Sequence, residues 1–358
     1  MQSSVSQLIV PERLRPGDTV ALISLSGGRA GDPDLLPRYQ EGKRRLEKLF
    51  GLRTVETPHA LKGSAFLYDH PELRAADLMW ALENPEVRGV FCIMGGDDSY
   101  RVLPYVDLKV IREHPKVFMG YSDIATWMAV FAAAGVRAYY GPNLLTPIAQ
   151  PGALDDYTRQ AMEKTLFSAQ VIGEVPPSPR TTPIEWKDLP ADQIVWTPNP
   201  GYRILQGRGK VRGRLFGGCA GPLQQIMGTP YFPDRDFFDG VFFALECMDL
   251  YGSSLATLHQ LRAFAAAGSF DRAAGLLVGP TSREDREVLL KVIRQEVHRE
   301  DLVILENVDF VHRTPMTVLP IGALCEIDCD SARLSILEPG VRWGPTILPI
   351  KEPAHGTH

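Results

Sequence analysis

The stretch KVFMGYSDIATWMAVFAAAG (residues 116–135) predicts a buried strand, a tight turn and an apolar helix in immediate succession. The apolar run KVFM has the length of a short strand, and the helix begins at Asp123, directly after the turn. Gly135 follows the last apolar residue, where a glycine commonly ends a helix. The turn Gly120–Asp123 is therefore expected at the carboxyl end of a strand.

The same alternation of strands and helices continues toward the N-terminus. Thr19–Ser24 and Val87–Met94 are predicted strands, and Leu36–Leu49 and Pro71–Glu83 are predicted helices. The strands are continuous apolar runs, as expected where helices cover both faces of a parallel sheet. We therefore predict an α/β fold whose ligand site lies at the carboxyl ends of strands.

A proline-dense segment divides the 358 residues, a length that suggests two domains. Residues 169–204 predict a connection or a long surface loop, because prolines interrupt every periodic pattern there. The expected domains are residues 1–168 and residues 205–358. The second is a mixed α/β domain with predicted strands at Gly240–Cys247 and Thr317–Ile327.

Composition narrows the range of partners and compartments. A formal charge of −5 argues against a nucleic-acid polymer as a partner. No apolar run approaches a membrane span, and the first residues lack the basic and apolar regions of a secretory signal, so no membrane contact is expected. The five cysteines are odd in number and form no C-x-x-C pair, which favours a reducing cytoplasm over a disulfide framework or a zinc site.

The tetrapeptide Gly120-Tyr121-Ser122-Asp123 is the sharpest candidate for chemistry. A serine at a strand-to-helix turn projects its hydroxyl from the top of the sheet, which is the arrangement of a nucleophile elbow. Free N–H groups and the positive end of the helix dipole can stabilise an oxyanion there. The alternative is an ordinary helix N-cap, a common role of Ser and Asp.

Two further features have both a functional and a structural interpretation. The loop Gly95–Ser99 follows a predicted strand, and its paired glycines allow close backbone approach to a ligand, or form an ordinary turn. Glu246 ends the apolar run GVFFALEC. A carboxylate in that position needs a hydrogen-bonding or charged partner or a site that water can reach, unless the strand end is simply exposed.

His312 lies in a loop between predicted strands and is the best-placed candidate for a general base. The other histidines have no comparable context, and no cluster of cysteines and histidines suggests a metal. Ser122, Glu246 and His312 together could form a triad, although sequence order alone adds little to that interpretation. Such a site would lie between the two domains, where pockets commonly occur.

Seven sequence blocks resemble the LD-carboxypeptidase family of serine peptidases, and within it the branch of microcin C self-immunity peptidases. The resemblance covers nearly the whole chain, and its specificity comes from the spacing among the blocks. The resembling blocks are residues 14–24, 67–107, 116–125, 139–144, 201–218, 241–246 and 312–322.

This resemblance implies a role for each candidate residue. Ser122 matches the family nucleophile, His312 the general base, and Glu246 the glutamate that orients the histidine. The backbone N–H groups of Gly96 and Asp123 would be the oxyanion donors. The implied fold is an N-terminal flavodoxin-like parallel-sheet domain with a C-terminal swivelling mixed α/β domain, in a homodimer.

The branch determines the expected substrate. In the immunity-peptidase branch a loop tryptophan stacks on the adenine of an aminoacyl-nucleotide, and Trp186 lies where that residue is expected. The structural alternative is that Trp186 anchors its loop or packs at a dimer interface. Further substrate contacts are expected at Gly95, Asp98, Ser99 and Tyr121.

Three positions depart from the family pattern. Cys219 stands where relatives commonly have Asn, Val311 precedes the histidine where Gly is frequent, and Arg313 follows it where small residues are common. These changes are expected to reshape the substrate pocket without removing a catalytic group.

The sequence thus predicts a cytoplasmic serine amidase without metal or cofactor, which cleaves an amide in a small peptidyl- or aminoacyl-nucleotide compound. Two enzymatic alternatives use the same triad: a murein tetrapeptide LD-carboxypeptidase and a tailoring amidase of natural-product metabolism. A catalytically silent protein that sequesters a nucleotide-like ligand is the alternative from another class.

Overall fold

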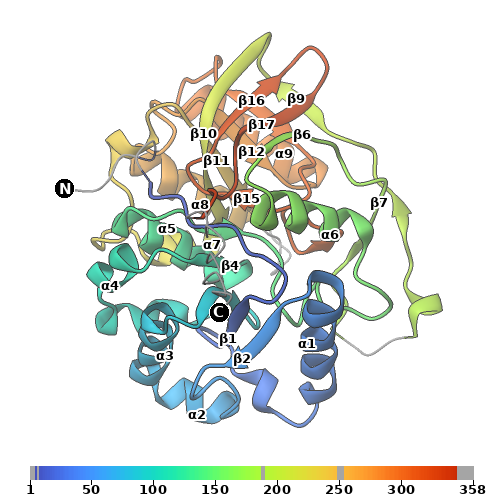
Figure 1. Ribbon diagram of the computed structural model, residues 1–358. Coiled ribbons are helices and arrows are strands. Elements are labelled where there is room, and N and C mark those ends of the chain that lie inside the picture. The colour runs from blue at the N-terminus through green and yellow to red at the C-terminus, as the bar shows by residue number, and fades with distance from the viewer. Residues whose placement is uncertain (1–4, 6–7, 187–189, 248–253, 345–358) are drawn as a thin grey trace, which may run out of the picture.

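Two β-sheets form the framework of the molecule (Figure 1). The structure is a computed structural model that describes residue 5 and residues 8–186, 190–247 and 254–344. The first sheet has the strand order β15-β5-β4-β3-β1-β2, in which β1 to β5 run parallel and β15 is antiparallel to β5. Its strands are β1 (Thr19–Ile23), β2 (Arg53–Glu56), β3 (Val87–Cys92), β4 (Val117–Gly120), β5 (Tyr139–Tyr140) and β15 (Leu319–Pro320).

Helices cover both faces of this first sheet. Alternate residues of β1 point to opposite sides: Ala21 and Ile23 join one hydrophobic cluster, while Val20 and Leu22 join another. The first cluster lies under α3 (Pro71–Glu83), α4 (Leu108–Glu113) and α5 (Ala125–Ala134), and the second under α1 (Leu36–Phe50). A short helix, α2 (Ser64–Asp69), precedes α3. This arrangement confirms the α/β class, with the carboxyl ends of β3 and β4 side by side.

The second sheet is mixed, with the order β6-β17-β16-β10-β11-β12-β13-β9. Its four central strands, β10 to β13, are parallel, and its outer pairs are antiparallel. Its strands are β6 (Val171–Val175), β9 (Arg203–Gln206), β10 (Lys210–Cys219), β11 (Val241–Glu246), β12 (Gly275–Val278), β13 (Val303–Glu306), β16 (Leu324–Asp328) and β17 (Arg333–Pro339). The helices in this part of the chain are α6 (Asp156–Met162), α7 (Ala220–Gln225), α8 (Ser254–Ala266) and α9 (Arg283–Lys291).

Two segments differ from the sequence-based expectation. The predicted strand Thr317–Ile327 is broken at Gly322, whose φ of 78° is left-handed; β15 before it pairs with the first sheet and β16 after it pairs with the second. The proline-dense segment is not wholly irregular. It contributes β6, an edge strand of the second sheet that ends directly before the first prolines of the segment. It also contributes β7 (Arg180–Pro183) and β8 (Thr197–Pro198), which form a small sheet with β14 (Arg313–Thr314).

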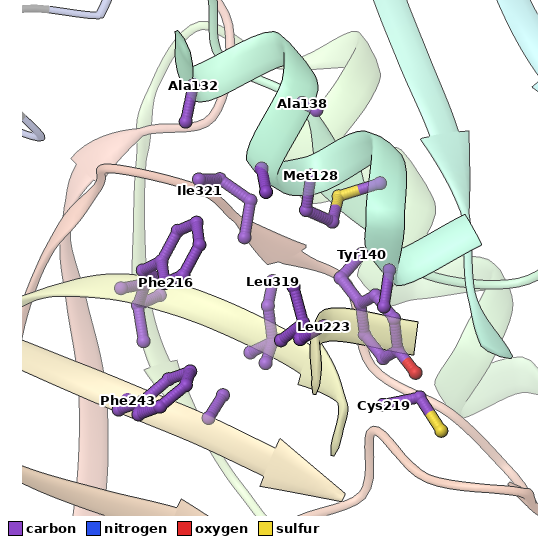
Figure 2. Packing of buried hydrophobic residues seen from close by; sticks show 14 of the residues in the cluster. Met128, Ala132, Ala138, Tyr140, Phe216, Cys219, Leu223, Phe243, Leu319 and Ile321 are labelled. Carbon is purple, nitrogen blue, oxygen red and sulfur yellow. The ribbon is translucent and has the colours of Figure 1, made fainter. Parts of the chain in front are cut away.

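One hydrophobic core joins the two sheets. Figure 2 shows Met128 of α5 and Phe216 of β10 in the same hydrophobic cluster, with Tyr140 and Ile321 between the two elements. Gly218 makes this contact possible, because a Cβ there would lie 2.8 Å from the Tyr140 ring and 2.8 Å from Ala125 Cβ. The carboxyl ends of β4 and β11 are thereby brought together. No helix in the described part of the chain is long and apolar enough to cross a membrane.

Candidate active site

Ser122 lies at a sharp turn between β4 and α5. Its φ of 67° is left-handed, which is uncommon for a residue with a side chain and characteristic of strained functional turns. Its Oγ is 2.8 Å from His312 Nε2. The structure thus gives Ser122 the elbow conformation rather than that of a simple helix cap, and places its hydroxyl within hydrogen-bond reach of a base.

Glu246 and His312 complete a chain of hydrogen bonds. Glu246 is the last residue of β11 and is buried, and its Oε1 lies 2.7 Å from His312 Nδ1. The same oxygen accepts a bond of 2.6 Å from the backbone N–H of His312. The carboxylate therefore fixes both the ring and the backbone of the histidine. The end of this strand is therefore not exposed, and its carboxylate is buried and hydrogen-bonded.

Tyr140, at the end of β5, contacts both ends of this chain of hydrogen bonds. Its hydroxyl accepts the backbone N–H of Ser122 at 3.2 Å and donates to Glu246 Oε2 at 3.2 Å. Sequence reasoning missed this role. The usable signal was its position at the carboxyl end of a strand adjacent to β4, within the block YYGPNL.

Burial and the neighbouring Glu246 shift the pKa of His312 in opposite directions. Burial by itself lowers the pKa of the imidazole, since the charged form is disfavoured away from water. The charge of Glu246 and its hydrogen bond favour the imidazolium and more than offset burial, so the pKa of His312 is raised from its ordinary value of 6.5. A base of this kind takes up a proton near neutral pH readily.

The glycine loop after β3 lies against the serine turn. A Cβ at Gly95 would be 2.7 Å from Ser122 Cβ and 2.8 Å from its Oγ, so only glycine fits without displacement. Gly95 O also accepts the Gly27 N–H at 3.0 Å, which ties this loop to the one after β1. Gly96 is exposed, and its N–H donates to no partner among the described residues.

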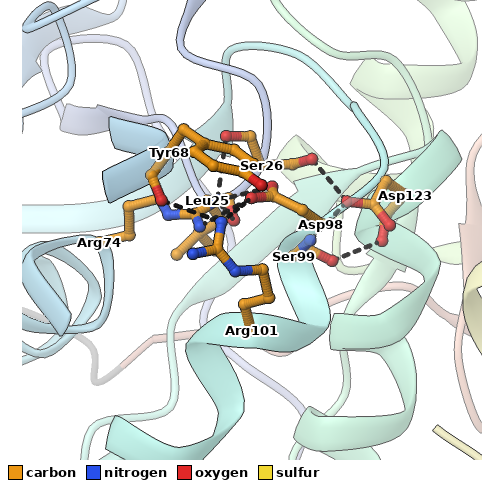
Figure 3. Close-up of polar contacts among 8 residues, drawn as sticks. All are labelled: Leu25, Ser26, Tyr68, Arg74, Asp98, Ser99, Arg101 and Asp123. Carbon is orange, nitrogen blue, oxygen red and sulfur yellow. Dashed lines mark hydrogen bonds and ion pairs between the residues drawn. The ribbon is translucent and has the colours of Figure 1, made fainter. Parts of the chain in front are cut away.

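Asp123 connects its own turn to the loops after β1 and β3 (Figure 3). Its buried Oδ2 accepts the Ser26 hydroxyl at 2.5 Å and the Ser99 N–H at 2.8 Å. The Ser99 hydroxyl in turn donates to the Asp123 backbone carbonyl at 3.0 Å. Burial raises the pKa of the Asp123 carboxyl, and the two serines only partly counter that effect.

Four residues expected to contact a substrate have other partners in the structure. Ser99 is fully buried against Asp123, which fits a positioning role. Tyr121 is also buried; its ring lies 5.0 Å from the His312 ring and its hydroxyl pairs with Thr146. Asp98 forms ion pairs with Arg74 and Arg101 (Figure 3), and Gly95 contacts Ser122.

Trp186 lies in the segment after β7, and its side chain is 41% exposed. The neighbouring Glu185 carbonyl accepts a bond of 2.9 Å from Arg38 of α1, so this segment reaches across to the first sheet. Part of the expected substrate loop, residues 187–189, lies outside the described residues. The exposed indole is available for stacking, in contrast to the buried Trp127.

The three departures from the family pattern lie near the histidine. Cys219 ends β10 in register with Glu246, and burial, followed by the charge of that carboxylate, raises the pKa of its thiol. Val311 packs closely against Gly279, and Arg313 Nε donates to Thr181 Oγ1 at 3.0 Å. Among the described residues, no group of three or more histidines, cysteines and acids is placed to hold a metal ion.

Comparisons with known proteins agree with this geometry. The family models for the LD-carboxypeptidase N-terminal and C-terminal domains match residues 20–141 and 212–327. The microcin C7 self-immunity protein MccF of Escherichia coli is 28% identical over 284 residues, which cover 74% of this chain and 78% of that protein. The "Probable murein peptide carboxypeptidase" of Bacillus subtilis strain 168 is 28% identical over 345 residues, covering 93% and 96%.

A solved structure shares the whole architecture. The MccF-like protein from Streptococcus pneumoniae, in complex with AMP, superposes with a TM-score of 0.82 at 26% identity. The alignment covers 89% of this chain and 98% of that one. The arrangement of the two sheets is therefore common to both.

Replacement of Gly95 tests the close approach of the two loops. In Gly95→Ala the added methyl group overlaps Ser122, so the serine hydroxyl must move away from His312. Because a misplacement of about 1 Å can cost about 100-fold in rate, we expect amide hydrolysis to slow by about that factor while the thermal melting curve is retained. Gly221→Ala is the control, since its Cβ meets nothing closer than 3.7 Å. An unchanged rate in Gly95→Ala would contradict the tight fit.

Proposed function

The chain belongs to the LD-carboxypeptidase family, and we propose that it is a serine amidase that cleaves an aminoacyl- or peptidyl-nucleotide at its amide bond. The observation that supports this proposal most directly is the continuous hydrogen-bonded chain from Ser122 through His312 to Glu246. A nucleophile, a base and a carboxylate thus lie in sequence within hydrogen-bond distance. This is the geometry of nucleophilic catalysis.

In the first half of the reaction, Ser122 Oγ attacks the scissile carbonyl carbon while His312 Nε2 takes the hydroxyl proton. Glu246 keeps the proton on Nδ1, so that Nε2 is free to accept, and it stabilises the imidazolium that forms. The backbone N–H groups of Gly96 and Asp123 are proposed to hold the oxyanion. This assignment is supported by the closeness of the two loops, since a Cβ at Gly95, next to Gly96, would lie 3.4 Å from Asp123 N.

In the second half, the imidazolium of His312 gives its proton to the leaving amine, and the C–N bond breaks. Water then attacks the acyl-enzyme with His312 again as the base, which releases the acid and restores Ser122. Tyr140 contributes by holding the Ser122 N–H and Glu246 in one network throughout. It is a positioning residue, since it contacts the triad and not the reacting carbonyl.

The nucleotide part of the proposal rests on two observations. The similar Streptococcus pneumoniae protein is described in complex with AMP, and the similar Escherichia coli protein is a microcin C7 self-immunity protein. This chain presents an exposed Trp186 on a segment that spans the two sheets. A flat indole suits stacking on a nucleobase. Cleavage of such a compound would be a detoxification, and thus an antibiotic-resistance activity.

Murein tetrapeptide carboxypeptidase activity is the second candidate. It is favoured by the Bacillus subtilis relative, whose alignment spans 93% of this chain, more than the alignment with the immunity protein. Both candidates use the same three catalytic groups, so they differ only in what occupies the surrounding pocket.

We infer that the protein acts in the cytoplasm as a homodimer. The five cysteines are free, which is the usual state in a reducing compartment. The dimer is carried over from the family resemblance and is checked by measuring the mass of the protein in solution.

Removal of the nucleophile is the primary test of the proposal. Ser122→Ala is expected to lower the turnover of an aminoacyl-sulfamoyl-adenosine by about 10⁴-fold or more, because no other group replaces the attacking oxygen. Product masses after incubation, with a muropeptide assayed in parallel, distinguish the two candidate substrates. Ser168→Ala, away from the triad, serves as the control. Wild-type turnover in Ser122→Ala would refute the mechanism.

The pH profile tests the roles of His312 and Glu246. His312 acts as a base only when neutral, so kcat/KM should fall as the pH decreases, with a midpoint above pH 6.5 because the pKa of His312 is raised. In Glu246→Gln the cause of that rise is removed while burial remains, so the midpoint should move to lower pH. The rate should also fall by about 10⁴-fold. An unmoved midpoint in this variant would argue against the pair.

Substitution of Trp186 tests nucleobase stacking. Stacking on an aromatic side chain contributes about 1–3 kcal/mol per base. Trp186→Ala should therefore raise KM for an aminoacyl-sulfamoyl-adenosine by about 10-fold while leaving a tetrapeptide substrate unaffected. Trp343→Ala is a matched control, since this indole is 57% exposed and packs on Arg13. Equal effects on both substrates would favour the loop-anchoring role instead.

A further inference from the structure

Asp309 lies at the base of the loop that carries His312. Its backbone carbonyl accepts the Thr317 N–H at 2.6 Å, so the loop 309–317 is closed at this residue. Its side chain is only 6% exposed. Within the described part of the chain, the hydrogen bonds of its carboxylate go to Ser178 and Asn199, which are distant in the sequence.

These two partners are the ends of the segment that carries Trp186 (residues 178–199, the tryptophan segment). Asp309 Oδ2 accepts the backbone N–H of Ser178 at 2.8 Å. Asp309 Oδ1 lies 3.0 Å from Ser178 Oγ and 3.0 Å from Asn199 Nδ2. Ser178 precedes β7 and Asn199 follows β8, so a single carboxylate holds both ends of the tryptophan segment.

Asn199 extends this network to the end of β13. Its Oδ1 accepts the Asn307 Nδ2 group at 2.7 Å and the Gly201 N–H at 3.0 Å. The amide is therefore oriented with its oxygen toward these donors and its nitrogen toward the carboxylate of Asp309. Asn307, only 8% exposed, directly follows β13, so the network is anchored on the second sheet.

The tryptophan segment also pairs with the backbone at His312. In the antiparallel pair of β7 and β14, Pro183 lies opposite Arg313, the residue after the histidine. The Ile184 N–H donates to the His312 carbonyl at 3.4 Å, and Trp186 follows two residues later. The proposed base and the exposed indole thus belong to one small structural unit, and Asp309 is the point at which its parts are joined.

This junction requires a carboxylate. Burial raises the pKa of the Asp309 carboxyl to about 6, so the group is ionised above that pH and can accept from every donor around it. Hydrogen bonds to a charged acceptor stabilise more than bonds between neutral groups. An Asn side chain at this position would have one acceptor oxygen, and its NH2 group would face another donor.

We propose that Asp309 is a positioning residue for the amidase reaction: its carboxylate sets the place of His312 relative to the segment that carries Trp186. The inference rests on the proposed function and adds to it a residue that acts through others. One substitution at Asp309 should therefore disturb two steps at once, the proton transfer at His312 and the binding of the nucleobase at Trp186.

The test measures kcat and KM of Asp309→Asn at about pH 8, with an aminoacyl-sulfamoyl-adenosine and a muropeptide tetrapeptide as substrates. We expect kcat to fall about 10-fold on each compound that the wild type cleaves, part of the roughly 100-fold that a 1 Å misplacement can cost. KM should rise about threefold for the nucleotide compound alone, and this rise should vanish when Trp186→Ala is already present. Ser178→Ala, which removes one neutral donor, should show the same changes on a smaller scale.

Two variants separate positioning from folding. Asp77→Asn is the matched control: this carboxylate of α3 is 2% exposed and accepts bonds from Thr57 and His59. It should lower the melting temperature and leave kcat and KM within about twofold of wild type. The exchange of Asp309→Asn with Asn199→Asp again places a carboxylate against an amide, and should restore part of kcat.

Wild-type kcat and KM in Asp309→Asn, with only a lower melting temperature, would overturn the positioning role while the amidase function stands. A rise in KM that persists without Trp186 would overturn it as well. Failure of the function itself differs, since the wild type would then hydrolyse neither compound. Amide hydrogen exchange then decides: faster exchange at both β7 and β14 in Asp309→Asn, and not in Asp77→Asn, supports the positioning role, and unchanged exchange overturns it.

Discussion

The left-handed backbone of Ser122 is the constraint on which the rest of the site depends. A residue with a side chain adopts this conformation only when its surroundings enforce it. Here the Tyr140 hydroxyl holds the N–H of Ser122 from one side, and the carboxylate of Asp123 anchors the turn to the loops after β1 and β3 from the other. Gly95 then leaves the space that the serine side chain needs. The strain is thus maintained by contacts from β5 and from the loops after β1 and β3.

The same geometry explains why the two sheets share a core. Ser122 comes from the first sheet, whereas Glu246 and His312 come from the second sheet and a loop beside it. A triad split in this way remains in register only if the sheets do not slide. The contact of Gly218 with Tyr140 and Ala125 fixes the two sheets at close range, and interiors packed at this density resist displacement. The structure therefore achieves catalytic alignment through the packing between sheets.

Sequence patterns predicted those features that depend on neighbours along the chain. The elbow, the apolar strand that ends in Glu246 and the boundaries of α3 are local features of this kind. The fold class inferred from strand–helix alternation and the family inferred from the resemblance of seven sequence blocks are confirmed. The contacts of the Tyr140 hydroxyl and of the Asp123 carboxylate were not predicted, because their partners are distant in the sequence. The break at Gly322 was missed for the same reason: only pairing with two different sheets interrupts that apolar run. The expected domain boundaries stay a prediction.

Two of the three departures from the family pattern lie at one cavity. Val311 and Arg313 both line a cavity beside His312, whereas Cys219 ends β10 in register with Glu246 and is not among the lining residues. Val311 fills the space above Gly279, where a Cβ would collide with it, so the shape of this wall depends on both residues together. The proposed catalytic residues agree with the family resemblance, whereas Cys219, Val311 and Arg313 depart from it. A difference of this kind changes which compound is bound without changing the reaction, because specificity depends on the fit of the pocket and rate on the alignment of the triad. The resemblance therefore supports the proposed reaction, whereas the acyl group must be inferred from the pocket of this chain.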